Sequence, residues 1–84
     1  MAQILVVDDD AAILALVKRM LAMKGHTAEV VGDGTEALKY LDDFVPDLIL
    51  SDIYMPHMGG KALFVEVRAR GLEVPFVAMS GNLT

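Results

Sequence analysis

The sequence contains no cysteine, which excludes a disulfide framework, a cysteine-ligated zinc site and a thiol nucleophile. Basic residues are few and scattered: seven Lys and Arg stand against twelve Asp and Glu, for a net charge of −5. We expect no nucleic-acid partner, because neutralising phosphates needs clustered cations. No apolar run is long enough to span a bilayer, and no basic segment precedes the first one, so no membrane association or secretory signal is predicted. These absences favour a cytoplasmic protein.

Length and hydrophobicity limit the architecture. A chain of 84 residues buries only about 60% of its unfolded surface, so we expect a single domain over residues 1–84. The hydrophobic share of 55% and the mean hydropathy of +0.49 are high for so small a domain. We therefore expect part of the apolar surface to be covered by a partner.

Four short apolar runs alternate with three segments of helical periodicity. The runs are residues 4–7, 27–31, 48–50 and 76–79. The first and third runs are apolar at every position, as is typical of interior parallel strands, whereas Glu29 makes the second run a better edge strand. Strands that alternate with helices form right-handed crossovers, so the pattern predicts an α/β fold with a parallel sheet covered by helices.

The three helical segments each carry apolar residues that are expected to face the core. These positions are Ile13, Leu14, Val17, Met20 and Leu21 in the first segment, Ala37, Leu38, Leu41 and Phe44 in the second, and Leu63, Phe64 and Val67 in the third. Gly25 and Gly71 follow the first and third segments, as expected of glycines that end a helix in the left-handed conformation.

Polar side chains follow three of the four strands. Asp8, Asp9 and Asp10 come after the first strand, Asp52 after the third and Ser80 after the fourth, so we expect them to meet at one edge of the sheet. Carboxylates held close together repel one another unless a cation neutralises them, and oxygen ligands favour a hard ion such as Mg²⁺. Two simpler interpretations stay open: the first three aspartates can cap the following helix, and Asp52 can be a solvated loop residue.

Three segments together resemble the receiver domains of response regulators in two-component signalling. They are residues 4–10, residues 52–60 and residues 76–80, and the resemblance extends over residues 3–82. It implies a flavodoxin-like doubly wound sheet with strand order 2-1-3-4. It further implies that Asp52 is the phosphoacceptor, and that the partner is a histidine kinase or a phosphotransfer protein. A receiver of this kind accepts a phosphoryl group and is not a turnover enzyme.

The resemblance also implies roles for the other polar residues. Asp8, Asp9 and Asp52 would hold Mg²⁺ together with the backbone carbonyl of Tyr54, and Ser80 would donate a hydrogen bond to a phosphoryl oxygen.

One departure from the family lies at the C-terminus. Receivers continue through a fourth helix, a fifth strand with a phosphoryl-binding lysine, and a fifth helix, whereas this chain stops after the fourth strand. We expect this truncation to uncover apolar side chains of the sheet, including flanks of Ile4, Val6, Leu48 and Leu50. A homodimer through the uncovered surfaces would bury them.

Two alternative functions remain at this point. Without the lysine, the chain can be a non-switching interaction module or a remnant of a receiver. More remotely, residues 32–37 match the G-x-G-x-x-A dinucleotide pattern. Against the second alternative, Asp33 and Glu36 would place negative charge where a pyrophosphate must bind.

Overall fold

The computed structural model describes residues 1–55 and 58–79, which form four strands and three helices. In chain order the elements are β1 (Gln3–Val7), α1 (Ala11–Met23), β2 (Thr27–Val31), α2 (Gly34–Leu41), β3 (Leu48–Asp52), α3 (Gly60–Ala69) and β4 (Phe76–Met79). All strands are parallel and their order is β2-β1-β3-β4, which confirms the predicted α/β fold, with β1 and β3 inside the sheet. None of the helices in the described part of the chain is long and apolar enough to cross a membrane.

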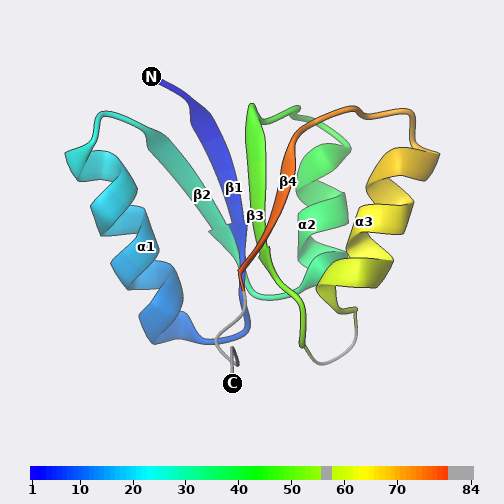
Figure 1. The fold of residues 1–84 in the computed structure, drawn as a ribbon, viewed down its shortest axis with the longest axis horizontal. Coiled ribbons are helices and arrows are strands. Elements are labelled where there is room, and N and C mark those ends of the chain that lie inside the picture. The colour runs from blue at the N-terminus through cyan, green and yellow to red at the C-terminus, as the bar shows by residue number, and fades with distance from the viewer. Residues whose placement is uncertain (56–57, 80–84) are drawn as a thin grey trace.

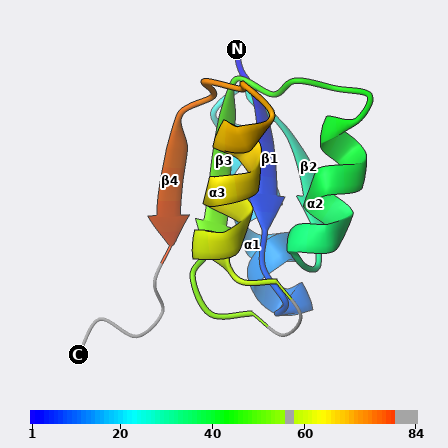
Figure 2. The same cartoon turned by 90° about the vertical axis from the view of Figure 1, so that its right-hand side faces the viewer.

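The helices cover the two faces of the sheet unequally. Helix α1 stands alone on one face, while α2 and α3 lie side by side on the other (Figures 1 and 2). The strand β1 contributes to the cores on both faces, because successive side chains of a strand point to opposite sides. Ile4 and Val6 pack in the core under α1, and Leu5 and Val7 pack in the core under α2 and α3. This two-sided burial explains why the run is apolar at every position.

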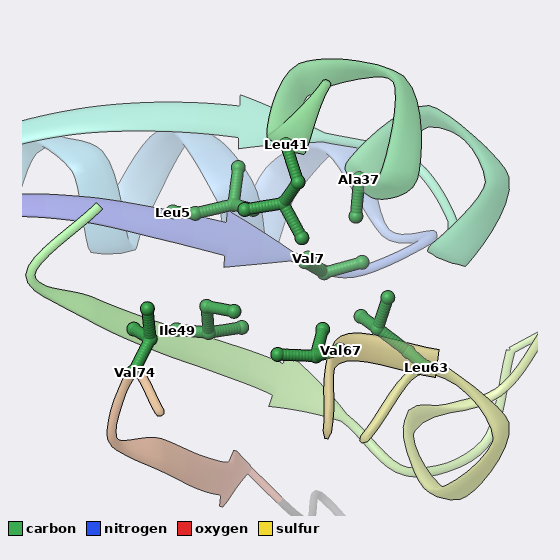
Figure 3. Close-up of a cluster of buried hydrophobic side chains, with 8 residues drawn as sticks. All are labelled: Leu5, Val7, Ala37, Leu41, Ile49, Leu63, Val67 and Val74. Carbon is green, nitrogen blue, oxygen red and sulfur yellow. The ribbon is translucent and has the colours of Figure 1, made fainter. Parts of the chain in front are cut away.

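The larger core lies between the sheet and the helices α2 and α3. Its buried side chains come from two strands, both helices and the segment before β4 (Figure 3). They are Leu5, Val7, Ala37, Leu41, Ile49, Leu63, Val67 and Val74. This core fixes α3 against the carboxyl end of β3, and so positions the loop that follows Asp52.

Helix α1 begins at a side-chain cap. The Asp10 carboxylate accepts hydrogen bonds from the backbone N–H groups of Ala12 at 2.9 Å and Ile13 at 3.4 Å, so the capping interpretation is confirmed for this residue. Gly25 and Gly71 adopt φ angles of 83° and 79°, which confirms their predicted left-handed conformation at the ends of α1 and α3.

Replacing Asp10 by Ala is expected to lower the free energy of unfolding by about 1 kcal/mol, because two N–H groups at the start of α1 lose their acceptor. Urea denaturation of the purified protein measures this loss. Asp10→Ser keeps a capping oxygen and should retain most of the stability. Equal losses in the two variants would show that the cap is not the cause.

Four helix-segment side chains are more exposed than the periodicity predicts. Ile13 and Met20 are 38% and 52% exposed, because α1 rests on the sheet through Leu14, Val17 and Leu21 instead. Phe44 was expected in α2, but the helix ends at Leu41 and the ring stacks on Tyr40 at the surface, with ring centroids 5.1 Å apart. The fourth, Phe64, is 40% exposed and lies edge-on to Phe76. For these positions the core prediction was wrong.

The expected exposure of the sheet is also partly wrong. Ile4 and Val6 are 5% and 0% exposed, because α1 covers them, whereas Leu48 and Leu50 are half-buried. Among the described residues, exposed large apolar side chains are found instead on α1, on α3, on β4 at Val77, and in the segment after α2.

Candidate metal centre

Three aspartates meet at the carboxyl end of the sheet. Asp8 directly follows β1 and Asp52 is the last residue of β3, and the register of these neighbouring strands pairs Val7 with Ser51. As a result Asp8, Asp9 and Asp52 each contribute a carboxylate oxygen, and the three oxygens lie within 4.8 Å of one another. The structure thus brings together the three acidic side chains that the sequence indicates as metal ligands.

Asp8 is the buried member of this acidic cluster. It is 6% exposed, and burial is the main cause that raises the pKa of its carboxyl group above the ordinary 3.8. The negative charges of Asp52, Asp9 and Asp10 raise this pKa further, while the Asp10 N–H, which donates to Asp8 Oδ1 at 2.9 Å, works in the opposite direction. The ionised form of Asp8 is therefore disfavoured until a cation balances the cluster.

The donor set fits a hard divalent cation. All three side chains offer carboxylate oxygens, and Asp9 is exposed while Asp52 is half-buried, so the cluster is open to solvent on one side. Mg²⁺ is bound in proteins by one or two carboxylates, with water and phosphate oxygens completing its coordination. The acidic cluster suits that ion and leaves room for a phosphoryl group.

Backbone contacts hold the end of β3 in place. The N–H of Tyr54 donates to Asp52 Oδ1 at 3.3 Å, and the buried hydroxyl of Ser51 donates to the Asp52 carbonyl at 2.9 Å. The Tyr54 side chain is exposed to solvent. That the backbone carbonyl of Tyr54 binds the metal remains a prediction. Ser80, expected at a phosphoryl oxygen, lies outside the described residues.

The loop after Asp52 is fixed by contacts that the sequence did not reveal. The start of α3 lies so close to β3 that a Cβ atom on Gly60 would be 2.5 Å from the Asp52 carbonyl oxygen. The N–H of Gly34, at the start of α2, donates to the Met58 carbonyl at 3.3 Å. The paired glycines at 59 and 60 are a signal for a close approach, but no pattern in the sequence points to the contact between α2 and the loop.

Residues 32–37, which match the glycine pattern, include the start of α2, and Asp33 caps this helix. The Asp33 carboxylate accepts from the N–H of Glu36 at 2.9 Å, and so occupies the position at which a dinucleotide phosphate would meet the helix. The preceding strand β2 is an edge strand, as Glu29 predicted. These two observations favour the cap over a nucleotide site.

The chain matches the response regulator receiver domain family over residues 4–84, and it belongs to that family. It is 39% identical over 80 residues to the transcription factor SKN7 of Saccharomyces cerevisiae, and 37% identical over 80 residues to the Regulator of RpoS of Escherichia coli. Each match covers 95% of this chain but only 13% and 24% of those proteins. The chain thus spans a minor part of the relatives that it matches.

Solved structures agree with the family. The chemotaxis response regulator CheY4 of Vibrio cholerae superposes with a TM-score of 0.93 at 31% identity, covering 100% of this chain and 72% of that one. A CheY-like receiver domain from Methylobacillus flagellatus gives a TM-score of 0.90 at 35% identity, covering 96% and 70%. Receiver domains of this family bind Mg²⁺ through acidic residues, in agreement with the acidic cluster.

Proposed function

We propose that this chain is a Mg²⁺-dependent phosphoacceptor in which Asp52 takes a phosphoryl group from a phosphohistidine of a kinase or phosphotransfer protein, or from a small acyl phosphate. The observation that carries the proposal is the position of the Asp52 carboxylate beside Asp8 and Asp9, with oxygens within 4.8 Å. Membership of the family supports the more general proposal that the chain interacts with phosphodonor proteins of this kind.

In this reaction an Asp52 carboxylate oxygen attacks the phosphorus atom. A new O–P bond forms while the P–N bond of the phosphohistidine breaks, and the bonding electron pair stays on the imidazole nitrogen. The Tyr54 N–H orients the attacking carboxylate, and Asp8 and Asp9, with the Tyr54 carbonyl, would hold the cation. Bound Mg²⁺ would offset negative charge on the transferring group, which is the main requirement of phosphoryl transfer. Ser80 is proposed to donate to a phosphoryl oxygen.

The test is intact-mass analysis after incubation with a small acyl phosphate, with and without Mg²⁺. We expect one phosphoryl adduct in the wild type with Mg²⁺ and almost none without the ion. Asp52→Asn should lose the adduct entirely, whereas Asp43→Asn, a change at an exposed carboxylate at the end of α2, should keep it. An undiminished adduct on Asp52→Asn would place the acceptor elsewhere.

A second candidate function is a non-switching interaction module, favoured by the exposed apolar surface. A groove of about 380 Å³ lies between α3 and β4, lined mainly by apolar side chains that include Phe64, Val65 and Phe76. A protein that binds Mg²⁺ but gains no adduct from any phosphodonor would support this candidate.

In either case we propose that the chain acts as a homodimer, which would bury part of the exposed apolar surface.

A further inference from the structure

A small pocket lies at the sheet edge formed by β2, opposite the edge formed by β4 (Figure 2). Its volume is about 220 Å³. Sites for small organic ligands start at roughly 300 Å³, so this pocket suits a single side chain better than a whole ligand. The residues that line it come from β1, β2, α2 and the segment that follows α2: Gln3, Ile4, Thr27, Glu29, Tyr40 and Phe44.

Two stacked aromatic rings form one wall of the pocket. The ring centroids of Tyr40 and Phe44 are 5.1 Å apart, and the ring planes make an angle of 29°. Tyr40 packs against the larger core and is half-buried, whereas Phe44 is 56% exposed. The inner ring therefore fixes an outer ring that is largely open to solvent. Such a ring attracts a cation to its face, and the planar guanidinium of arginine can also stack on it.

Glu29 brings a negative charge to the same pocket. Its neighbour Ala28 packs under α1, so the alternation along β2 directs the Glu29 side chain to the face that α2 covers. Burial, and then the charge of Glu29, raise the pKa of the Tyr40 hydroxyl, which agrees with a carboxylate close to that ring. A second carboxylate, that of Asp47, accepts from the N–H of Gln3 at 2.8 Å. The pocket is thus acidic as well as aromatic.

Within the described part of the chain, no basic side chain forms an ion pair with Glu29. The ion pair found there joins Arg70 to Asp42 at 2.8 Å, and the guanidinium found over a ring is that of Arg68, 4.8 Å from the centroid of Phe64. Neither contact belongs to the pocket. They show separately how a guanidinium meets a carboxylate and how it meets a ring. The pocket offers a carboxylate and a ring in one place.

We infer that the pocket binds an arginine side chain of a partner protein, with the guanidinium stacked on Phe44 and paired with the Glu29 carboxylate. A guanidinium combines a planar face with a charged fork of N–H donors, whereas the lysine ammonium is a compact charge without such a face. Free arginine fits less well, because its own carboxylate would approach Glu29 and Asp47. The pocket lies near the beginning of β1, and the acidic cluster lies at the opposite end, so the inference does not depend on the phosphoacceptor function.

Amide NMR spectra of the protein at low salt, recorded during titration with N-acetyl-arginine N-methylamide, test the pocket. The lysine analogue tests the need for a planar cation, and the citrulline analogue keeps the shape of the side chain without its charge. We expect saturable shifts at Thr27, Glu29 and Phe44 with the arginine compound, weaker binding of the lysine compound and of free arginine, and none of the citrulline compound. Added salt should weaken binding. No saturable shift with the arginine compound, or equal binding of the citrulline compound, would overturn the inference.

Two variants each remove one of the proposed contacts. Glu29→Gln and Phe44→Leu should each weaken binding of the arginine compound about fivefold. The matched control Glu66→Gln removes a charge from an exposed position of α3 and should leave the affinity unchanged. The spectrum of each variant shows that it is folded, and all three should form the phosphoryl adduct on Asp52 as the wild type does. Equal affinities of Glu29→Gln and Glu66→Gln for the arginine compound would contradict the role of Glu29, and with it the inference.

Discussion

Replacing Asp8 by Asn is expected to remove most of the stabilisation by Mg²⁺ and, at the same time, to make the metal-free protein more stable. In the wild type, a cation that binds only the native state adds about 2.7 kcal/mol to the free energy of unfolding at 100 times its dissociation constant. Without the buried Asp8 carboxylate the acidic cluster keeps only two of its three candidate ligands, and most of this gain should disappear. Asn preserves an oxygen that can accept from the Asp10 N–H, so the local backbone contact need not be lost.

The gain in metal-free stability follows from the raised pKa of Asp8. Burial, and then the charges of Asp52, Asp9 and Asp10, raise the pKa in the native state above the ordinary 3.8, so the native state binds the proton more tightly than the unfolded chain. The contribution of Asp8 to stability therefore falls as the pH rises from 3.8 through the raised pKa, and stays low above it. An Asn at this position does not titrate, so the variant does not lose stability in this way as the pH rises.

Urea denaturation of wild type and Asp8→Asn, with EDTA or with Mg²⁺ and at several pH values, measures both effects. Asp43→Asn is the control for removing one negative charge far from the acidic cluster. Either of two results would contradict this prediction: Asp8→Asn less stable than the wild type in EDTA at neutral pH, or equal stabilisation of both proteins by Mg²⁺.

The sheet and the acidic cluster were the most predictable parts of this molecule. Each strand contains a short apolar run, and in the two interior strands this run is apolar on both faces because helices cover both sides, a pattern that the sequence displays directly. With the strand order β2-β1-β3-β4, β1 and β3 are parallel neighbours, so the residues at their carboxyl ends must lie side by side. The meeting of Asp8, Asp9 and Asp52 is thus a consequence of topology and needs no side-chain detail.

The orientation of the helices was less predictable. Apolar residues occupy more than half of the circumference of α1, so periodicity alone does not decide whether Leu14 or Met20 faces the sheet. The choice depends on how the whole helix docks on β1 and β2. The prediction for Phe44 was wrong for a different reason: the apolar spacing extends past the end of α2, and Phe44 lies in the loop between α2 and Pro46. The contact of Gly34 with the Met58 carbonyl depends likewise on how α2 and the loop pack together.

Replacing Gly60 by Ala is expected to lower the free energy of unfolding by about 2 kcal/mol, a typical cost of overpacking at a rigid contact. The added Cβ would lie 2.5 Å from the Asp52 carbonyl oxygen and 3.1 Å from the Ile53 Cα, and both are backbone atoms that no side-chain rotation can move. Because Leu63 and Val67 anchor α3 in the larger core, the helix cannot shift away without opening that core. The nearer of these atoms belongs to Asp52, the proposed phosphoacceptor, so the rate of adduct formation should fall as well.

The matched control is Gly32→Ala, where the new Cβ meets only the carboxyl group of the Glu36 side chain, with Oε2 at 3.1 Å. That side chain can rotate away, so the expected change in the free energy of unfolding is within about 0.5 kcal/mol. Urea denaturation of the two variants measures the difference between them. Equal stabilities would mean that α3 moves freely relative to β3, and the contact at Gly60 would then not be what holds the loop after Asp52 in position. A loss confined to Gly60→Ala, with slower phosphorylation in the folded protein, would show that the packing of α3 on β3 fixes the position of the Asp52 carboxylate.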